Sequence, residues 1–224
     1  MSCFKKALFL LSVCFFAEVA WAQNNDFGIS NDISIEKRLS KTFAVKAMTS
    51  TAFLQNAGEW AWTFADAGLV VRFTRNWQVS GQYRYTWRQN LRNQTVNRQI
   101  LYTQAVYAKS VGNFTVSWRG RLLRQWYGAT WNDNYRPTLW QLRNRAGLQY
   151  KGNYFWQPYL SAEVFIPLNG QYSASVTQWR TTLGIDYNPN DFNEISVYLQ
   201  LNKTVNRTPN TTRLLLGTAY AIRL

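Results

Sequence analysis

The amino-acid sequence predicts an all-β protein, a closed antiparallel transmembrane β-barrel of about ten to twelve strands with short periplasmic turns and longer external loops. Three observations predict this fold. Most of the chain alternates between apolar and polar residues at every second position, and Trp and Tyr gather near the ends of the alternating segments. Many segments run for about 11 to 13 residues, close to the length that crosses a bilayer at a tilt, whereas strands of soluble proteins centre on about five or six.

The alternation is clearest in the stretch Trp77–Asn90. One set of alternate residues is Trp77, Val79, Gly81, Tyr83, Tyr85 and Trp87, and the other is Gln78, Ser80, Gln82, Arg84, Thr86 and Arg88. Alternate residues of a strand point to opposite faces, and no helical stripe fits this pattern. The stretch therefore predicts a strand with one aromatic and apolar face and one polar face that carries arginines.

The same alternation predicts strands along the rest of the chain. In chain order, the expected strands are Phe27–Leu39, Thr42–Leu54, Trp60–Phe73, Trp77–Gln89, Arg98–Lys109, Phe114–Gln125, Leu139–Tyr150, Tyr154–Ile166, Thr177–Tyr187, Phe192–Asn202 and Thr212–Leu224. Alternation is less clean in Thr42–Leu54 and Trp60–Phe73, and the phase of Arg98–Lys109 is ambiguous. Bacterial single-chain barrels have an even number of strands, so about eleven segments predict either ten strands, with Phe27–Leu39 outside the ring, or twelve.

The expected connections alternate between short and long, which is typical of outer-membrane barrels. Short turns are predicted near Ser40-Lys41, Arg75-Asn76, Val111–Asn113, Lys151–Asn153 and Asn188–Asp191. Longer polar loops are predicted near Gln55–Glu59, Asn90–Asn97, Tyr127–Thr138, Leu168–Ser175 and Lys203–Thr211.

Residues 1–22 have the pattern of a secretory signal peptide. Lys5 and Lys6 precede the short apolar run Ala7–Phe16, and Ala20–Ala22 forms an A-x-A cleavage signal. We expect cleavage between Ala22 and Gln23, which leaves residues 23–224 as one barrel domain. The apolar run is too short for a membrane-spanning helix, which needs about 20 residues. The segment predicts export, and the alternating domain then predicts location in the cell outer membrane.

The charge balance leaves a second class of protein open. The chain has 25 Lys and Arg residues against 11 Asp and Glu residues, a net charge of +14. Such an excess is typical of proteins that bind nucleic acid or anionic membranes. A soluble exported β-protein that binds an acidic polymer or nucleic acid on a basic aromatic face is therefore the alternative, since aromatic residues interleaved with arginines suit single strands. Export and the placement of the aromatic residues favour the barrel.

The residue types of the mature chain exclude several chemistries. There is no histidine, and both cysteines, Cys3 and Cys14, lie in the predicted signal peptide. Histidine bases, thiol nucleophiles and His or Cys metal sites are thus excluded, and there is no Gly-rich phosphate loop. Asp186 and Glu194 could form a carboxylate pair on neighbouring strands, but we expect them to be partners of arginines. We therefore predict no enzyme, no catalytic residue, no metal and no cofactor.

A charged network facing the lumen is the candidate functional site. Its arginines are Arg84, Arg88, Arg119, Arg121, Arg143, Arg145 and Arg180, and its acids are Glu36, Glu163, Asp186 and Glu194. One interpretation is an interlocked core, because bidentate Arg–carboxylate pairs offset the cost of burying charge. The other is a water-filled lumen with surplus positive charge that admits anions. The function predicted is that of a small outer-membrane barrel, either structural or a narrow pore that favours anions.

Several stretches resemble an uncharacterised outer-membrane barrel family of Gram-negative bacteria, classified as a domain of unknown function. They are Asp26–Ser40, Gly81–Tyr85, Trp118–Arg121, Leu142–Tyr150, Pro158–Phe165 and Trp179–Asp191. The resemblance implies a small outer-membrane barrel with no assigned activity. The expected partners are outer-membrane lipid and the barrel assembly machinery, and no nucleic acid is expected. Outer-membrane barrels usually end in an aromatic residue, whereas this chain ends in Leu224.

Overall fold

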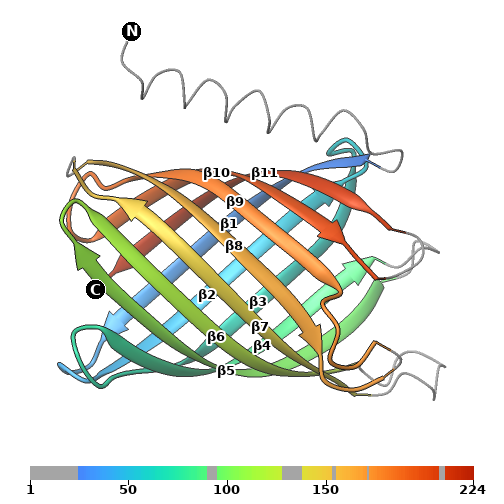
Figure 1. The fold of residues 1–224 in the computed structure, drawn as a ribbon, viewed down its shortest axis with the longest axis horizontal. Helices are drawn as coiled ribbons and strands as arrows, with labels where there is room; N and C mark the ends of the chain where they lie inside the picture. The colour runs from blue at the N-terminus through green and yellow to red at the C-terminus, as the bar shows by residue number, and fades with distance from the viewer. Residues whose placement is uncertain (1–24, 90–94, 128–137, 153–154, 171, 207–209) are drawn as a thin grey trace, which may run out of the picture.

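Each alternating segment of the sequence forms one strand of a single sheet that closes on itself (Figure 1). The computed structural model describes residues 25–89, 95–127, 138–152, 155–170, 172–206 and 210–224. The strands are β1 Asn25–Arg38, β2 Phe43–Leu54, β3 Glu59–Arg72, β4 Trp77–Gln89, β5 Thr95–Val111, β6 Phe114–Tyr127, β7 Leu139–Tyr150, β8 Trp156–Pro167, β9 Gln178–Tyr187, β10 Asn193–Thr204 and β11 Thr212–Arg223. The predicted all-β closed barrel is confirmed.

The ring closes through a parallel pair. Consecutive strands pair antiparallel, whereas β1 pairs with β11 in parallel from Asn25 opposite Thr212 to Glu36 opposite Arg223. With an odd number of strands in an up-and-down order, the first and last strands run in the same direction, so no other closure is available. Parallel pairing is slightly less stable per residue, but closure leaves no unpaired sheet edge.

The expected even number of strands is therefore wrong. The barrel has eleven strands, and Phe27–Leu39 lies inside the ring as β1 rather than outside it. Eleven lies within the predicted range of about ten to twelve strands, but neither ten nor twelve, the two even numbers expected, is correct.

The two faces of the sheet have the polarity opposite to that of a soluble barrel. On the outside, large apolar side chains remain exposed, among them Ile33 at 54%, Leu69 at 58% and Leu183 at 48%. On the inside, polar and charged side chains are buried, among them Asp66 at 4% and Glu163 at 2%. A soluble barrel places its apolar face inward. This inverted arrangement is the one expected of a barrel surrounded by lipid.

Aromatic residues form a contact belt on the outside near one end of the barrel. The ring centroids of Trp77 and Tyr107 lie 4.9 Å apart, and those of Trp156 and Tyr187 lie 4.6 Å apart. Near the other end, Trp126 Nε1 donates a hydrogen bond of 3.1 Å to Gln99 Oε1. Rings with one polar edge are typical of the two membrane–water interfaces.

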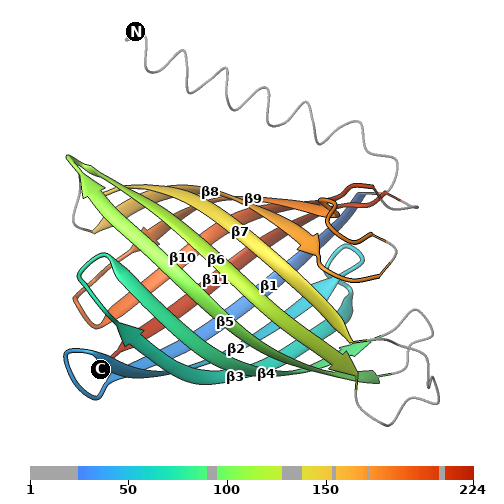
Figure 2. The same cartoon turned by 60° about the horizontal axis from the view of Figure 1, so that its bottom comes forward.

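The two rims of the barrel differ in their connections (Figure 2). We call one the turn rim, where residues 39–42, 73–76, 112–113, 151–155 and 188–192 connect strands, and the other the loop rim, where residues 55–58, 90–94, 128–138, 168–177 and 205–211 do so. The prediction of a longer loop at Gln55–Glu59 is wrong. Gln55, Asn56 and Ala57 have φ values of 53°, 58° and 64°, and this left-handed run closes the connection within four residues.

The whole predicted signal peptide and parts of the predicted loops fall outside the described residues. The cleavage site between Ala22 and Gln23 lies there, as do most of the predicted loops Asn90–Asn97 and Tyr127–Thr138. Within the described part of the chain, no helix is long and apolar enough to cross a membrane.

Candidate functional site

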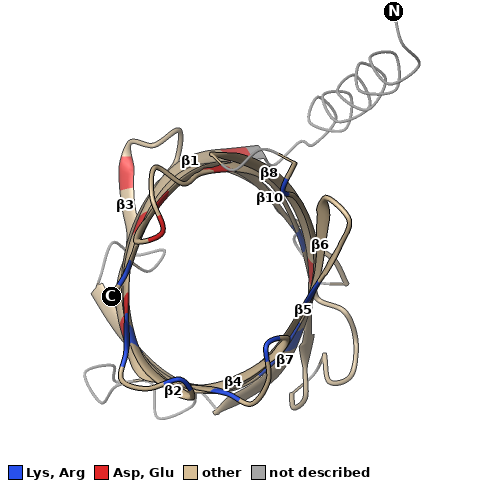
Figure 3. Ribbon diagram, turned by 90° about the vertical axis from the view of Figure 1, so that its left-hand side faces the viewer, with Lys and Arg blue, Asp and Glu red and all other residues tan. Residues whose placement is uncertain are grey.

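The predicted lumen arginines come from four strands and occupy the inward positions of each. Arg84 and Arg88 lie on β4, Arg119 and Arg121 on β6, Arg143 and Arg145 on β7, and Arg180 on β9. Their neighbours along the strands, such as Trp118 and Leu122, are exposed on the outside, and alternation then turns the arginines inward. The sequences of β4, β5, β6 and β7 contain no Asp or Glu. Figure 3 looks along the barrel and shows basic residues along the part of the wall where β2, β4, β5 and β7 are labelled.

Four of these arginines form a block on two adjacent strands. In the pairing of β6 with β7, Arg119 lies directly opposite Arg145, and Arg121 lies directly opposite Arg143. We call these four residues the arginine block. Like charges directly opposite each other on one face of a sheet are destabilising. The block therefore needs negative charge from elsewhere.

Glu163 on β8 is the acid that meets the arginine block. It lies opposite Arg145 in the sheet, and its carboxylate accepts a hydrogen bond of 2.6 Å from Arg119 Nη2. Its other oxygen lies 3.5 Å from Arg180 Nη1. The Glu163 side chain is 2% exposed, so this carboxylate is held by guanidinium groups rather than by bulk water.

The remaining contacts of the block are with neutral groups. Arg121 donates from Nε and Nη2 to Gln104 Oε1 at 3.1 and 2.7 Å, and Arg143 donates from Nε to Gln141 Oε1 at 2.8 Å. Arg145 donates no hydrogen bond to any residue that the structure describes. Amide oxygens orient these guanidinium groups without cancelling their charge.

Aromatic rings also hold lumen arginines. The Arg84 guanidinium carbon lies 3.7 Å from the centroid of Phe64. Phe165, which is buried, contacts two arginines, since its centroid lies 4.6 Å from the guanidinium carbon of Arg143 and 5.0 Å from that of Arg180. Cation–π contacts of this kind stabilise a charge without neutralising it.

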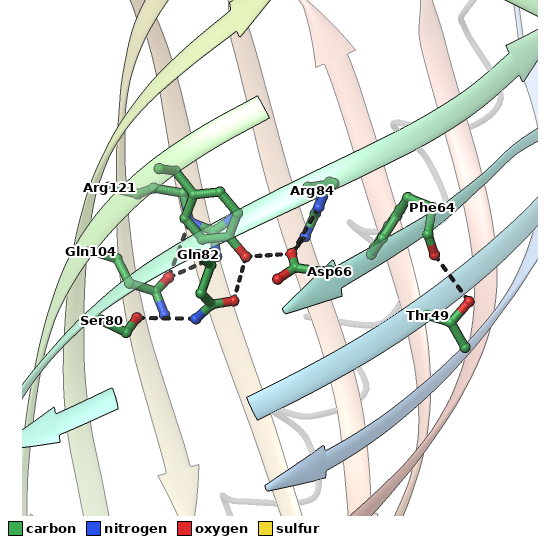
Figure 4. A network of polar contacts seen from close by, with 9 residues as sticks. Thr49, Phe64, Asp66, Ser80, Gln82, Arg84, Gln104 and Arg121 are labelled. Atoms are coloured by element: carbon green, nitrogen blue, oxygen red, sulfur yellow. Dashed lines mark hydrogen bonds and ion pairs between the residues drawn. The ribbon is translucent and has the colours of Figure 1, made fainter. Parts of the chain in front are cut away.

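A second network, which the sequence did not reveal, lies beside the arginine block (Figure 4). Asp66 Oδ2 accepts hydrogen bonds from Arg84 Nε and Nη2 at 2.9 and 2.7 Å, and it also contacts the hydroxyl of Tyr102. That hydroxyl lies 2.6 Å from Gln82 Oε1, and Gln82 Nε2 donates to Ser80 Oγ at 3.0 Å. In this network Arg84 has a buried carboxylate, that of Asp66, as its ion-pair partner.

Sequence reasoning missed Asp66 and Tyr102 because their strands alternate imperfectly. The phase of β3 is blurred by small residues on its outer face, such as Ala65 and Ala67. The run Phe64, Asp66, Gly68, Val70 lies on the inside, with Asp66 as its charged member. An isolated acid at an inward position opposite Arg84 was the signal that could have found this network.

The other predicted acids have different partners. Glu36 forms an ion pair with Arg72, and Glu194 forms one with Arg223. Asp186 departs from the expectation of an arginine partner, because it accepts hydrogen bonds from Ser196 Oγ at 2.7 Å and Gln149 Nε2 at 2.8 Å.

Arg88 lies near the loop rim, where its side chain is exposed. Among the described residues, no cluster of His, Cys, Asp and Glu side chains could hold a metal ion.

The sequence matches one protein family over most of its length. The model of the family described as "Protein of unknown function (DUF2490)" matches residues 27–213, which extend from β1 into β11. The chain belongs to this family. The predicted membership of an uncharacterised barrel family is thereby confirmed, and no curated protein matches the chain.

The solved structure of one porin shares the fold. The NanC porin in a rhombohedral crystal form superposes with a TM-score of 0.50 at 8% sequence identity, over 80% of this chain and 86% of that one. The KdgM porin in complex with disordered oligogalacturonate superposes with a TM-score of 0.45 at 8% identity, over 81% of this chain and 92% of that one. The closed sheet and the NanC comparison show a porin-like closed β-barrel fold.

Proposed function

We propose that this protein is a narrow outer-membrane pore that favours anions and that it is not an enzyme. The observation that carries the proposal is the charge of the arginine block. The block and Arg180 share the single carboxylate of Glu163, and the four strands from β4 to β7 supply no acid. A ring of fixed positive charge in a pore selects for anions.

The contacts of the lumen support a pore over a fully interlocked core. The arginine is fully paired around Asp66, where Arg84 donates two hydrogen bonds to Oδ2 of a buried carboxylate. Pairing is incomplete at the block, where Arg121 and Arg143 are held by amide oxygens and Arg145 by none of the described residues. Uncompensated guanidinium groups lower the energy of an anion that passes between them.

Electrical recording tests the selectivity. In a planar bilayer with a salt gradient, we expect a measurable current whose reversal potential favours anions. Replacing Arg119 and Arg121 by Gln should reduce that preference, because two positive charges leave the lumen. Arg124→Gln is the matched control, since Arg124 lies on the outer face of the same strand beside Trp126 and Trp140. A large, stable, cation-selective current would contradict the proposal.

Fractionation tests the location. The mature protein should sediment with outer membranes and require detergent for release, because its exposed surface is apolar. Without boiling, it should migrate faster in SDS than after boiling, as closed barrels often resist this detergent. Recovery in the soluble fraction at low ionic strength would instead support the exported soluble protein that binds an acidic polymer or nucleic acid.

A further inference from the structure

A cavity opens on the inner wall of the barrel, on the turn-rim side of the arginine block. Its volume is about 280 Å³. Ser117, Arg145, Tyr159, Ser161, Asp186 and Glu194 are among the residues that line it. These side chains come from five consecutive strands, β6 to β10, so the cavity is built by the folded barrel and by no single turn.

One side of the cavity is positive. Arg145 on β7 lines it, and this guanidinium donates no hydrogen bond within the described part of the chain. Its charge is repelled by Arg119 and Arg180 and attracted by Glu163, but Glu163 gives its ion pairs to those two arginines. All the donors of Arg145 therefore remain for a ligand.

The side of the cavity formed by β9 and β10 is negative. Asp186 on β9 is buried at 8% exposure, and the side chains that donate hydrogen bonds to it within the described part of the chain, Ser196 and Gln149, are neutral. Glu194 on β10 uses Oε2 for its ion pair with Arg223, which leaves Oε1 free of that pair. The cavity thus presents one cationic group on its β7 side and two carboxylates on its β9 and β10 side.

Tyr159 lies between these walls and is held in place. It belongs to β8, with Arg145 on β7 to one side of it and Asp186 and Glu194 on β9 and β10 to the other. Its ring rests on Gly184, where a Cβ atom would come within 2.6 Å of the Tyr159 hydroxyl. Any larger residue at position 184 would displace the tyrosine, so the glycine leaves the room that the Tyr159 ring occupies.

We propose that this cavity binds a small zwitterion, with its carboxylate or other oxyanion on Arg145 and its amine on Asp186 and Glu194. A simple anion would pair with Arg145 but would be repelled by the two carboxylates. A simple cation would pair with the carboxylates but would be repelled by Arg145. A molecule with both charges satisfies both walls, and hydrogen bonds to charged groups are the stronger kind. The site is independent of whether the lumen conducts ions.

Calorimetry on the purified protein in detergent tests the proposal. The probes are 4-aminobutyrate, butyrate and butylamine, which share a four-carbon chain and differ only in their charged ends. We expect 4-aminobutyrate to bind at least about tenfold more tightly than either of the others, since a tenfold ratio requires only one additional charged hydrogen bond. Butyrate that binds as tightly as 4-aminobutyrate, or no binding of any probe, would overturn the proposal.

Single substitutions assign each wall. Arg145→Gln should remove the advantage of 4-aminobutyrate over butylamine, and Asp186→Asn should remove its advantage over butyrate. Arg213→Gln is the control, because Arg213 lies in the first part of β11 with Asp26 as its partner, 3.0 Å away. This variant should leave all three affinities unchanged, and a change as large as that in Arg145→Gln would contradict the assignment.

A cavity-filling variant keeps the test decisive if a charge variant does not fold. Ser117→Leu adds volume without changing charge, beside Gly147, which has no side chain to obstruct it. Binding of 4-aminobutyrate should fall by at least about tenfold. Undiminished binding in a folded Ser117→Leu barrel would place the ligand elsewhere and refute the site.

Discussion

Replacement of Glu163 by Gln is expected to lower the free energy of unfolding by about 3–5 kcal/mol, the usual penalty for breaking a buried ion pair by removing one partner. Glu163 is the carboxylate shared by Arg119 and Arg180, and its side chain is 2% exposed. Without it, Arg119 and Arg180 would lose the acid that contacts them. Denaturant unfolding of the protein in detergent or lipid vesicles measures this loss.

Asp26→Asn provides the comparison for Glu163→Gln. Asp26 pairs with Arg213, but both side chains are partly exposed, at 25% and 33%. Water screens such a pair, so its loss should cost no more than about 1 kcal/mol. If Glu163→Gln also cost less than about 1 kcal/mol, water would have to reach Glu163, and the view of a tightly held carboxylate would be wrong.

Leu183→Arg is expected to lower the free energy of unfolding by about 2–4 kcal/mol, the cost of a basic residue on the lipid face near the bilayer midplane. Leu183 lies in the middle of β9, points outward and is 48% exposed. Thr182→Arg, one position earlier, introduces the same residue on the lumen face and should cost less. Unfolding of both variants in lipid vesicles gives the comparison.

The salt concentration matters for this pair of variants. An arginine at position 182 would lie on the same face as Arg180, so weak repulsion adds to its cost at low salt. Measurement at about 0.15 M salt, where the Debye length is about 8 Å, reduces that contribution. Equal costs for the two variants, or a larger cost for Thr182→Arg, would mean that the two faces of β9 are assigned the wrong way round.

The strands and their faces could be predicted because the side-chain period of two is a local property. The predicted strand Trp77–Gln89 coincides with β4, and Leu139–Tyr150 coincides with β7. The number of strands could not be predicted in this way. Whether β1 joins the ring depends on its pairing with β11, at the far end of the sequence, and no local pattern reports that contact.

The charges of the site were predictable, but their partners were not. Alternation placed the arginines of β6 and β7 on the inner face. The direct opposition of Arg119 to Arg145 depends on strand register, however, and a shift of two residues would keep every side chain on its face while changing every partner. For the same reason the sequence predicted an arginine partner for Asp186, whereas register brings Ser196 and Gln149 to it.

The parallel pairing of β1 with β11 determines whether the barrel could be circularly permuted with a short linker. β1 begins at the loop rim, whereas β11 ends at the turn rim, where Leu224 N donates to Glu36 O. In a barrel with an even number of strands, both ends lie at one rim, and a short linker suffices for circular permutation. Here a linker would have to traverse the apolar band, about 25 Å tall, which takes at least about eight extended residues. Such a linker could run only through the lumen, past the arginines.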